Sequence, residues 1–100
     1  MDYRVVWSPM AVDDVKAIGR YISADSPAYA AAVIQRLRDS TRVLKRFPFA
    51  GRIVPELGDD IIREKFVYSY RVIYRVHHRT VTIAAVIHGR RMLDLGNRFD

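Results

Sequence analysis

The chain has 100 residues and no cysteine, half of its residues are hydrophobic, and its formal net charge is +6. This length fits a single domain over residues 1–100, and the lack of cysteine excludes disulfides and Cys-based zinc or iron–sulfur sites. Charged residues interrupt the first 25 positions, so no signal peptide fits there, and no apolar run approaches the ~20 residues that span a bilayer. We therefore expect a cytoplasmic protein that is not membrane-bound and has an anionic partner.

The positive charge is concentrated in one part of the chain. Residues 61–91 carry seven basic side chains against one acidic side chain, whereas residues 1–60 carry nine against eight. Of the 17 basic residues, 14 are arginines, whose planar guanidinium groups suit phosphates, carboxylates and flat bases. An arginine-rich proteome would explain the total number of arginines equally well. The position of the excess positive charge along the chain is therefore the more informative observation.

Strand and helix signals alternate in the first half of the chain. Residues 3–7 are rich in β-branched and aromatic side chains and predict a strand. Ser8-Pro9 and Ser26-Pro27 each combine a favourable N-cap with a proline suited to the first helical position. Apolar residues at helical spacing follow both pairs. We therefore predict helices over about 9–24 and 27–46, joined by a turn as an antiparallel hairpin.

The second half reads as a loop followed by three strands. Proline, glycine and aspartate punctuate residues 48–60, which predicts a loop. Strand-like runs follow at 61–67, 70–76 and 81–87, and residues 89–100 form a tail or a short helix. The last run is apolar on both faces, so it is either central in its sheet or open to a partner. Its two predicted faces are Ala84 with Val86, and Val81 with Ile83, Ala85 and Ile87.

The predicted order β-α-α-β-β-β defines an α+β fold. The N-terminal helical hairpin packs on one face of an antiparallel sheet. The sequence contains no repeat, low-complexity tract or linker, in keeping with one domain.

The basic block supplies the candidate interaction residues. They are Arg63, Lys65, Arg71, Arg75, His88, Arg90 and Arg91. Arg71 and Arg75 alternate with apolar residues of their strand and point away from the predicted core, and Arg63 and Lys65 share one face of the preceding strand. If the strands pair in order, the set forms a basic concave face for RNA, DNA or an acidic peptide. The alternative is an ordinary solvated sheet face.

Few residues suit catalysis or metal binding. The adjacent histidines His77-His78 do not readily face one metal ion, and no Cys, Asp or Glu lies at ligand spacing. We therefore expect no metal and, without a Gly-rich phosphate loop, no cofactor. His88 is the one candidate general acid or base, the alternative being a polar residue at a strand end. Tyr68 is placed to stack on a base, whereas Tyr70 and Tyr74 fall on the predicted core side.

A set of short segments occurs in a specific order along the chain. They are Trp7-Ser8-Pro9 to Asp14, Tyr21-Ile22, Phe47-Pro48 with Gly51-Arg52, Val54-Pro55-Glu56, Ile62-Arg63-Glu64, the run Tyr70 to Val76, and His88-Gly89-Arg90-Arg91. Together, over about residues 3–94, they resemble the ParE/RelE toxin superfamily. The likeness is greatest to its ParE-like plasmid stabilisation branch.

The resemblance implies the toxin of a type II toxin–antitoxin pair. A cognate antitoxin, ParD-like or related, is expected to neutralise it through an acidic C-terminal segment. We place that segment on the doubly apolar last strand, residues 28–32 of the second helix and the arginines, a surface that suits alternating apolar and acidic residues. ParE-type toxins inhibit DNA gyrase, which is the expected target. The alternative is a RelE-type endoribonuclease that cuts mRNA on the ribosome, and a third interpretation is an interaction domain without toxicity.

The resemblance leaves open whether the chain is an enzyme, since both branches share the fold. Arg71 and Arg91 match basic positions of the ribonuclease branch, and His88 would have to serve as its acid or base. The branch's tyrosine position is taken by Asn97, which cannot exchange a proton at useful pH. Of the branch's paired lysines, Lys65 alone is nearby. These departures favour the gyrase-directed hypothesis.

Overall fold

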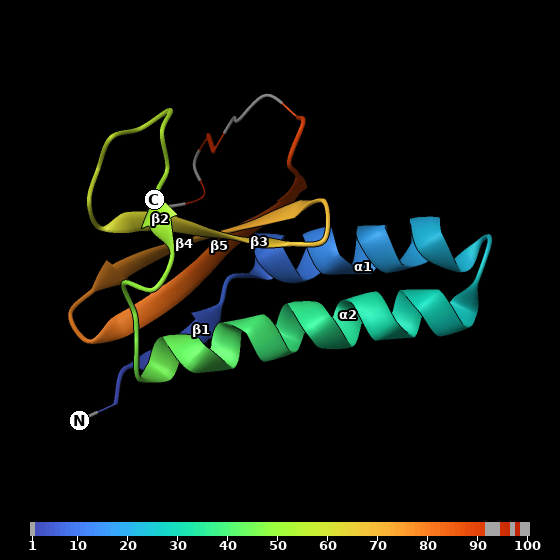
Figure 1. Ribbon diagram of the computed structural model, residues 1–100, viewed down its shortest axis with the longest axis horizontal. Coiled ribbons are helices and arrows are strands. Elements are labelled where there is room, and N and C mark those ends of the chain that lie inside the picture. Colours follow the sequence, from blue (N-terminus) through green and yellow to red (C-terminus); the bar gives the residue numbers. More distant parts are fainter. Residues whose placement is uncertain (1, 92–94, 97, 99–100) are drawn as a thin grey trace.

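The structure, a computed structural model, describes residues 2–91, 95, 96 and 98 of the chain. Two helices lie side by side in one layer against a five-stranded sheet (Figure 1). The elements in chain order are β1 Arg4–Trp7, α1 Pro9–Ser23, α2 Pro27–Arg42, the 3-10 turn η1 Val43–Lys45, β2 Arg52–Ile53, β3 Ile62–Val67, β4 Tyr70–His77 and β5 Thr80–His88. The predicted α+β fold with an N-terminal helical hairpin is confirmed.

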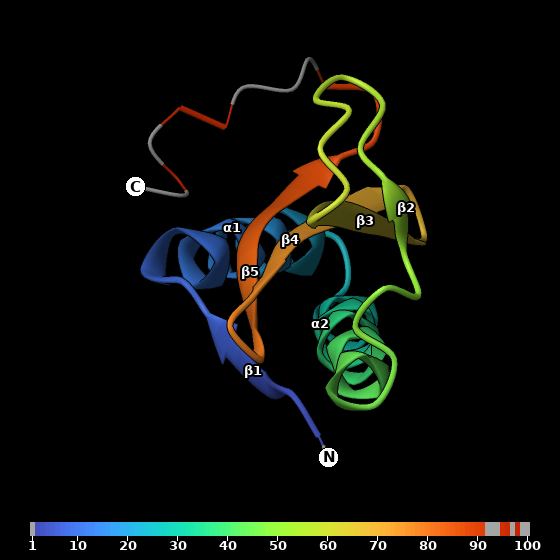
Figure 2. The same ribbon diagram turned by 90° about the vertical axis from the view of Figure 1, so that its left-hand side faces the viewer.

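The sheet corrects the sequence-based topology in two places. Its strand order is β1-β5-β4-β3-β2, and β1 runs parallel to β5 in an otherwise antiparallel sheet. The segment 48–60, predicted as a loop, contains the two-residue strand β2 at the sheet edge. Seen along the helices, the loop between β2 and β3 lies on the far side of the sheet from α2 (Figure 2). Residues 80–83 of β5 lie between β1 and β4, so this half is central, which is one of the two predicted alternatives, whereas residues 85–88 pair with β4 alone.

Both helices begin where the sequence predicts. The Ser8 hydroxyl accepts a hydrogen bond from the Ala11 amide at 3.1 Å, and the Ser26 hydroxyl accepts one from the Tyr29 amide at 3.1 Å. The second helix ends at Arg42, before the predicted residue 46, because the chain tightens there into η1. Within the described residues, neither helix has the length and apolar character needed to cross a bilayer.

The main core fills the space between the sheet and the helices. Its buried members are Ala11, Val15, Val33, Leu37, Leu44, Val67, Val72, Tyr74, Val76, Val81, Ile83 and Val86. A smaller cluster of Val54, Ile73 and Ala85 lies on the opposite, open face of the sheet. The predicted core side of β4, with Tyr70, Val72, Tyr74 and Val76, is confirmed.

A β-bulge divides the apolar residues of β5 between these two clusters. Ile73 lies opposite Ala85 and Tyr74 lies opposite Ile83, so Ala84 is an extra residue on β5. The extra residue shifts the alternation, so Ala85 and Ile87 turn to the open face while Ile83 stays in the main core. The prediction that Val81, Ile83, Ala85 and Ile87 share one face is therefore wrong.

Side chains cover the outer edge of β5 beyond the end of β1. The Val86 amide donates to the Asp14 carboxylate at 2.9 Å, and the Arg98 guanidinium donates to the Ala84 carbonyl at 2.9 Å. Asp14 and Arg98 also form a bidentate ion pair with distances of 2.7 and 3.1 Å. They thus satisfy backbone groups of a strand edge that would otherwise be left without a strand neighbour.

Candidate functional site

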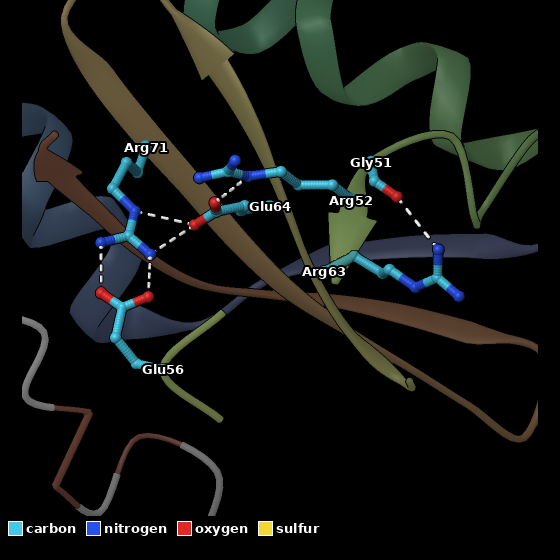
Figure 3. Close-up of polar contacts among 6 residues, drawn as sticks. All are labelled: Gly51, Arg52, Glu56, Arg63, Glu64 and Arg71. Carbon is cyan, nitrogen blue, oxygen red and sulfur yellow. Dashed lines mark hydrogen bonds and ion pairs between the residues drawn. The ribbon is translucent and has the colours of Figure 1, made fainter. Parts of the chain in front are cut away.

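A buried ion-pair network surrounds Arg71 on the open face of the sheet. The Arg71 side chain is 6% exposed and the Glu64 side chain on β3 is 0% exposed. Arg71 Nε donates to Glu64 Oε1 at 2.7 Å, and its Nη1 and Nη2 donate to the two oxygens of Glu56 at 2.8 and 2.9 Å (Figure 3). The second Glu64 oxygen accepts from Arg52 Nε at 2.6 Å. Two arginines and two glutamates therefore compensate one another, and Arg71 is enclosed by carboxylates.

The electrostatics of this network favour the charged forms of Glu56 and Arg71. The bidentate hydrogen bond from Arg71 lowers the pKa of Glu56 to about 2. In return, the bonds to Glu56 and Glu64 raise the pKa of Arg71 above its usual value. Glu56 and Arg52 are the exposed members of the network, and Glu56 is the one that lies over the terminal nitrogens of Arg71. An anionic ligand that approached Arg71 would therefore have to displace Glu56.

A close approach at Gly51 positions the neighbouring arginines. The Gly51 amide donates to the Tyr74 hydroxyl at 2.9 Å, and Arg63 Nη1 donates to the Gly51 carbonyl at 3.1 Å. A Cβ at this position would lie 2.5 Å from the Glu64 carbonyl oxygen, so a glycine is required. Burial raises the pKa of the Tyr74 hydroxyl. These contacts hold the backbone at Gly51 against β3, so that Arg52 lies opposite Glu64 and can bond to its carboxylate.

The predicted basic residues do not share one face of the sheet. The Lys65 ammonium donates to the Ser40 carbonyl of α2 at 3.0 Å, so Lys65 points to the helices, and burial lowers its pKa. Arg63 lies on the same face of β3, two residues away. Arg71 and Arg75 lie on the open face. The expected single basic face is therefore wrong, because the sheet separates the side chains that alternate along its strands.

His88, Arg90 and Arg91 follow one another at the end of β5, in the register position next to Arg71. His88 lies opposite Tyr70, and the two rings contact edge to face with centroids 5.8 Å apart. Since Tyr70 packs against the main core, His88 lies on the helix side of the sheet and Arg71 on the open side. His88 and Arg91 line a groove of about 630 Å³ against α1, which we call the β5 groove. The structure thus brings these two together and separates them from Arg71.

A second groove, of about 460 Å³, lies between β1 and the helical hairpin, and we call it the β1 groove. The apolar residues that line it are Val5, Trp7, Val12, Val15 and Ile34. The basic residues that line it are Lys16, Arg38, Arg42 and Lys45. Sequence analysis missed this groove, although the helical spacing of positions 38, 42 and 45 places three of the cations on one face.

The remaining candidates are placed as follows. The rings of His77 and His78 contact each other with centroids 3.9 Å apart, and no group of three or more potential metal ligands occurs among the described residues. Tyr68 is exposed in the turn between β3 and β4. Most of residues 28–32 are exposed at the start of α2. Asn97, which takes the tyrosine position of the ribonuclease branch, lies outside the described residues.

The fold, a helical hairpin on a sheet with one parallel edge pair, has counterparts among known protein families and solved structures. The family model of the ParE toxin of type II toxin–antitoxin systems, parDE, matches residues 5–93. The chain therefore belongs to the ParE toxin family. The comparison with curated proteins found no match.

Solved structures show the same fold. A chain of the chromosomal ParDE TA system from P. aeruginosa superposes with a TM-score of 0.72 at 18% identity, covering 86% of this chain and 95% of that one. A chain of the toxin–antitoxin complex RelBE2 from Mycobacterium tuberculosis superposes with a TM-score of 0.59 at 24% identity, covering 88% and 99%. At these identities the likeness extends to the fold and not to the target.

Proposed function

We propose that this ParE-family toxin inhibits DNA gyrase without catalysing a reaction and that a cognate antitoxin neutralises it. The observation that carries the proposal is the enclosure of Arg71, because it removes the cation that an RNA-cutting site of the RelE type would use. The proposed action is therefore docking on gyrase and not the cleavage of a substrate.

The ion-pair network argues against phosphodiester chemistry at Arg71. Stabilising a developing charge on a phosphate requires donors that are already oriented toward it. In this chain Nε of Arg71 is bonded to Glu64, and both terminal nitrogens are bonded to Glu56. Withdrawing Arg71 toward a ligand would leave Glu64 buried with one partner, which costs several kcal/mol. His88 lies on the other side of the sheet, so it is not placed to act on a phosphate held by Arg71.

The β1 groove supports an antitoxin that contributes an extended, acidic and partly apolar segment. An apolar floor with a basic rim suits apolar side chains that alternate with carboxylates. The groove also lies beside β1, an edge strand of the sheet, to which an extended segment can add by backbone hydrogen bonding. This placement differs from the predicted one on β5, where β1 covers residues 80–83 and the side chains of Asp14 and Arg98 bond to the edge beyond them.

Charge reversal on the groove rim tests the antitoxin site. The double substitution Arg38→Glu with Arg42→Glu should weaken antitoxin binding at least tenfold and leave growth arrest in place when the antitoxin is co-expressed. The matched control is Arg36→Glu, an exposed position of the same helix that does not line the groove. Equal loss of antitoxin affinity in the control and in the groove variant would contradict the placement.

A supercoiling assay with purified gyrase, run beside translating ribosomes with mapped mRNA ends, tests the target. Inhibited supercoiling with intact mRNA is the expected result. Loss of growth inhibition in cells that carry a resistant gyrase would support it further. A chain that leaves both gyrase and translation unaffected, and is harmless when expressed alone, would instead indicate an interaction domain without toxicity.

The alternative function is a ribosome-dependent mRNA endoribonuclease. The observation in its favour is the shared β5 groove of His88 and Arg91, which places a titratable ring beside an exposed cation. Cleavage of mRNA on the ribosome that disappears in His88→Ala and in Arg91→Ala would establish this alternative and overturn the gyrase proposal.

A further inference from the structure

The helical hairpin projects beyond the end of the sheet (Figure 1). Exposed aromatic residues lie on the elements that meet there. Tyr21 at the end of α1, Tyr29 at the start of α2 and Tyr68 in the β3–β4 turn are 80%, 52% and 56% exposed. The rings of Tyr29 and Tyr68 contact edge to face with centroids 6.4 Å apart. We call the surface of Tyr21, Tyr29, Tyr68, Tyr70 and His88 the aromatic step.

The aromatic step continues into the β5 groove. Tyr21, Tyr70 and His88 all line that groove, together with Arg91. The Gly89 amide donates to the Ser69 carbonyl at 2.6 Å, which fastens the end of β5 to the β3–β4 turn. The end of β5 and the turn that carries Tyr68 are therefore held together, and the part of the surface at Tyr21, Tyr70 and His88 is concave.

Tyr68 occupies a backbone conformation that a tyrosine rarely adopts. It is the first of the two residues in the β3–β4 turn, with φ at 53°, where glycine is the usual residue. Its ring is exposed, so packing in the core does not offset the free-energy cost of the positive φ. Residues held at such cost concentrate at functional sites. The turn therefore holds an exposed ring beside that of Tyr29.

Arginines surround much of the aromatic step, although Asp25 is exposed in the turn between α1 and α2, next to the helix ends that carry Tyr21 and Tyr29. Arg90 and Arg91 are exposed directly after β5. The acidic residue that lines the groove, Asp14, is held in its bidentate ion pair with Arg98. The β5 groove contains the aliphatic residues Ala17, Ile18, Val86 and Ile87, and beside them the rings of Tyr21, Tyr70 and His88 and the guanidinium group of Arg91. Exposed planar rings next to guanidinium groups match the bases and phosphates of a flexible single strand. The β1 groove has a single aromatic residue, Trp7, among its apolar lining and suits a protein segment.

We propose that the aromatic step binds single-stranded nucleic acid. Bases stack on Tyr21, Tyr29 and Tyr68, and Arg90 and Arg91 contact the phosphates. This binding is separate from the action on gyrase and does not depend on it, so each can fail without the other.

Fluorescence anisotropy of the full chain with fluorescein-labelled (dT)15, U15 and a 15-base-pair duplex tests the proposal. Both single strands should bind more tightly than the duplex, since stacking needs unpaired bases. Tyr68→Leu and Tyr21→Leu should each weaken single-strand binding about tenfold, whereas Tyr68→Phe, which keeps the ring, should stay within about twofold. Arg91→Ala should reduce the slope of log affinity against log salt by about 0.7.

The matched control is Phe47→Leu, which removes another exposed ring that lies outside the aromatic step. It should leave binding unchanged. Tyr21 is highly exposed on a helix, so its substitution does not threaten the fold and keeps the test decisive. Equal weakening by Phe47→Leu, equal affinity for the duplex, equal affinity for poly-glutamate, or no binding at 50 mM salt would each overturn the proposal.

Discussion

Removing Arg71 should destabilise the protein more than removing Arg71 and Glu64 together. In Arg71→Met, Glu64 stays buried and keeps one partner, Arg52, at 2.6 Å. Breaking a buried ion pair typically costs 3–5 kcal/mol, and the surviving bond places this case at about 3 kcal/mol. For a chain of 100 residues, that loss corresponds to a fall in Tm of about 15 °C.

The double variant Arg71→Met with Glu64→Leu removes both buried charges. Apolar replacement of a buried pair is close to neutral, so this variant should lie within about 1 kcal/mol of the wild type. Arg52 and Glu56 are exposed enough to be solvated when they lose their partners. Thermal and urea unfolding followed by circular dichroism measure all three proteins. If the single and double variants are equally destabilised, or Arg71→Met costs less than about 1 kcal/mol, the ion-pair reasoning is refuted.

Three further predictions concern Glu56 in the loop between β2 and β3, the close contact at Gly51, and the Ser8 cap of α1. The pKa of Glu56 is lowered to about 2, so its pairing stabilises the fold above pH ~4.5, and this stabilisation is lost as the pH falls toward 2. Glu56→Gln should remove this pH dependence, which amounts to up to about 1 kcal/mol in the free energy of unfolding, and should flatten the acid part of a Tm-against-pH curve. An unchanged curve would contradict the pairing. Gly51→Ala should cost about 1–3 kcal/mol in urea unfolding, because its Cβ meets the Glu64 carbonyl, and a neutral result would show that the chain relaxes there. Ser8→Ala should cost about 1 kcal/mol in thermal unfolding through the lost cap, and Ser8→Gly should recover most of it unless the cap contributes nothing.

Features encoded over a few residues were predictable from the sequence. Ser8-Pro9 and Ser26-Pro27 gave the two helix starts, since capping depends on neighbouring residues. The alternation in β4 correctly turned Arg71 away from the core. The family resemblance is confirmed by the match over residues 5–93, because it rests on residues spread along nearly the whole chain.

Features that depend on distant pairing were not predictable. The alternation gave the face of Arg71, but nothing local indicated that Glu56 would fold over it from another loop. The bulge at Ala84 turns the residues that follow it on β5 to the face opposite to the predicted one. The sequence has no glycine or proline at this position that would indicate a bulge. The β1 groove required knowing that β1 is an edge strand. In each case the missing information was which strand lies beside which.

The pairing of β1 with β5 has a consequence for how the protein is made. The first strand of the chain finds its partner at residues 80–83, so the sheet cannot close until most of the chain has left the ribosome. Contacts of such long sequence separation also form slowly, since the intervening chain must be ordered first. The floor of the β1 groove, with Val5 and Trp7, therefore depends on a strand contact of long sequence separation. Nascent chains stalled before β5 would hold neither the closed sheet nor the groove, so toxicity and recognition by the antitoxin would arise in the same folding event.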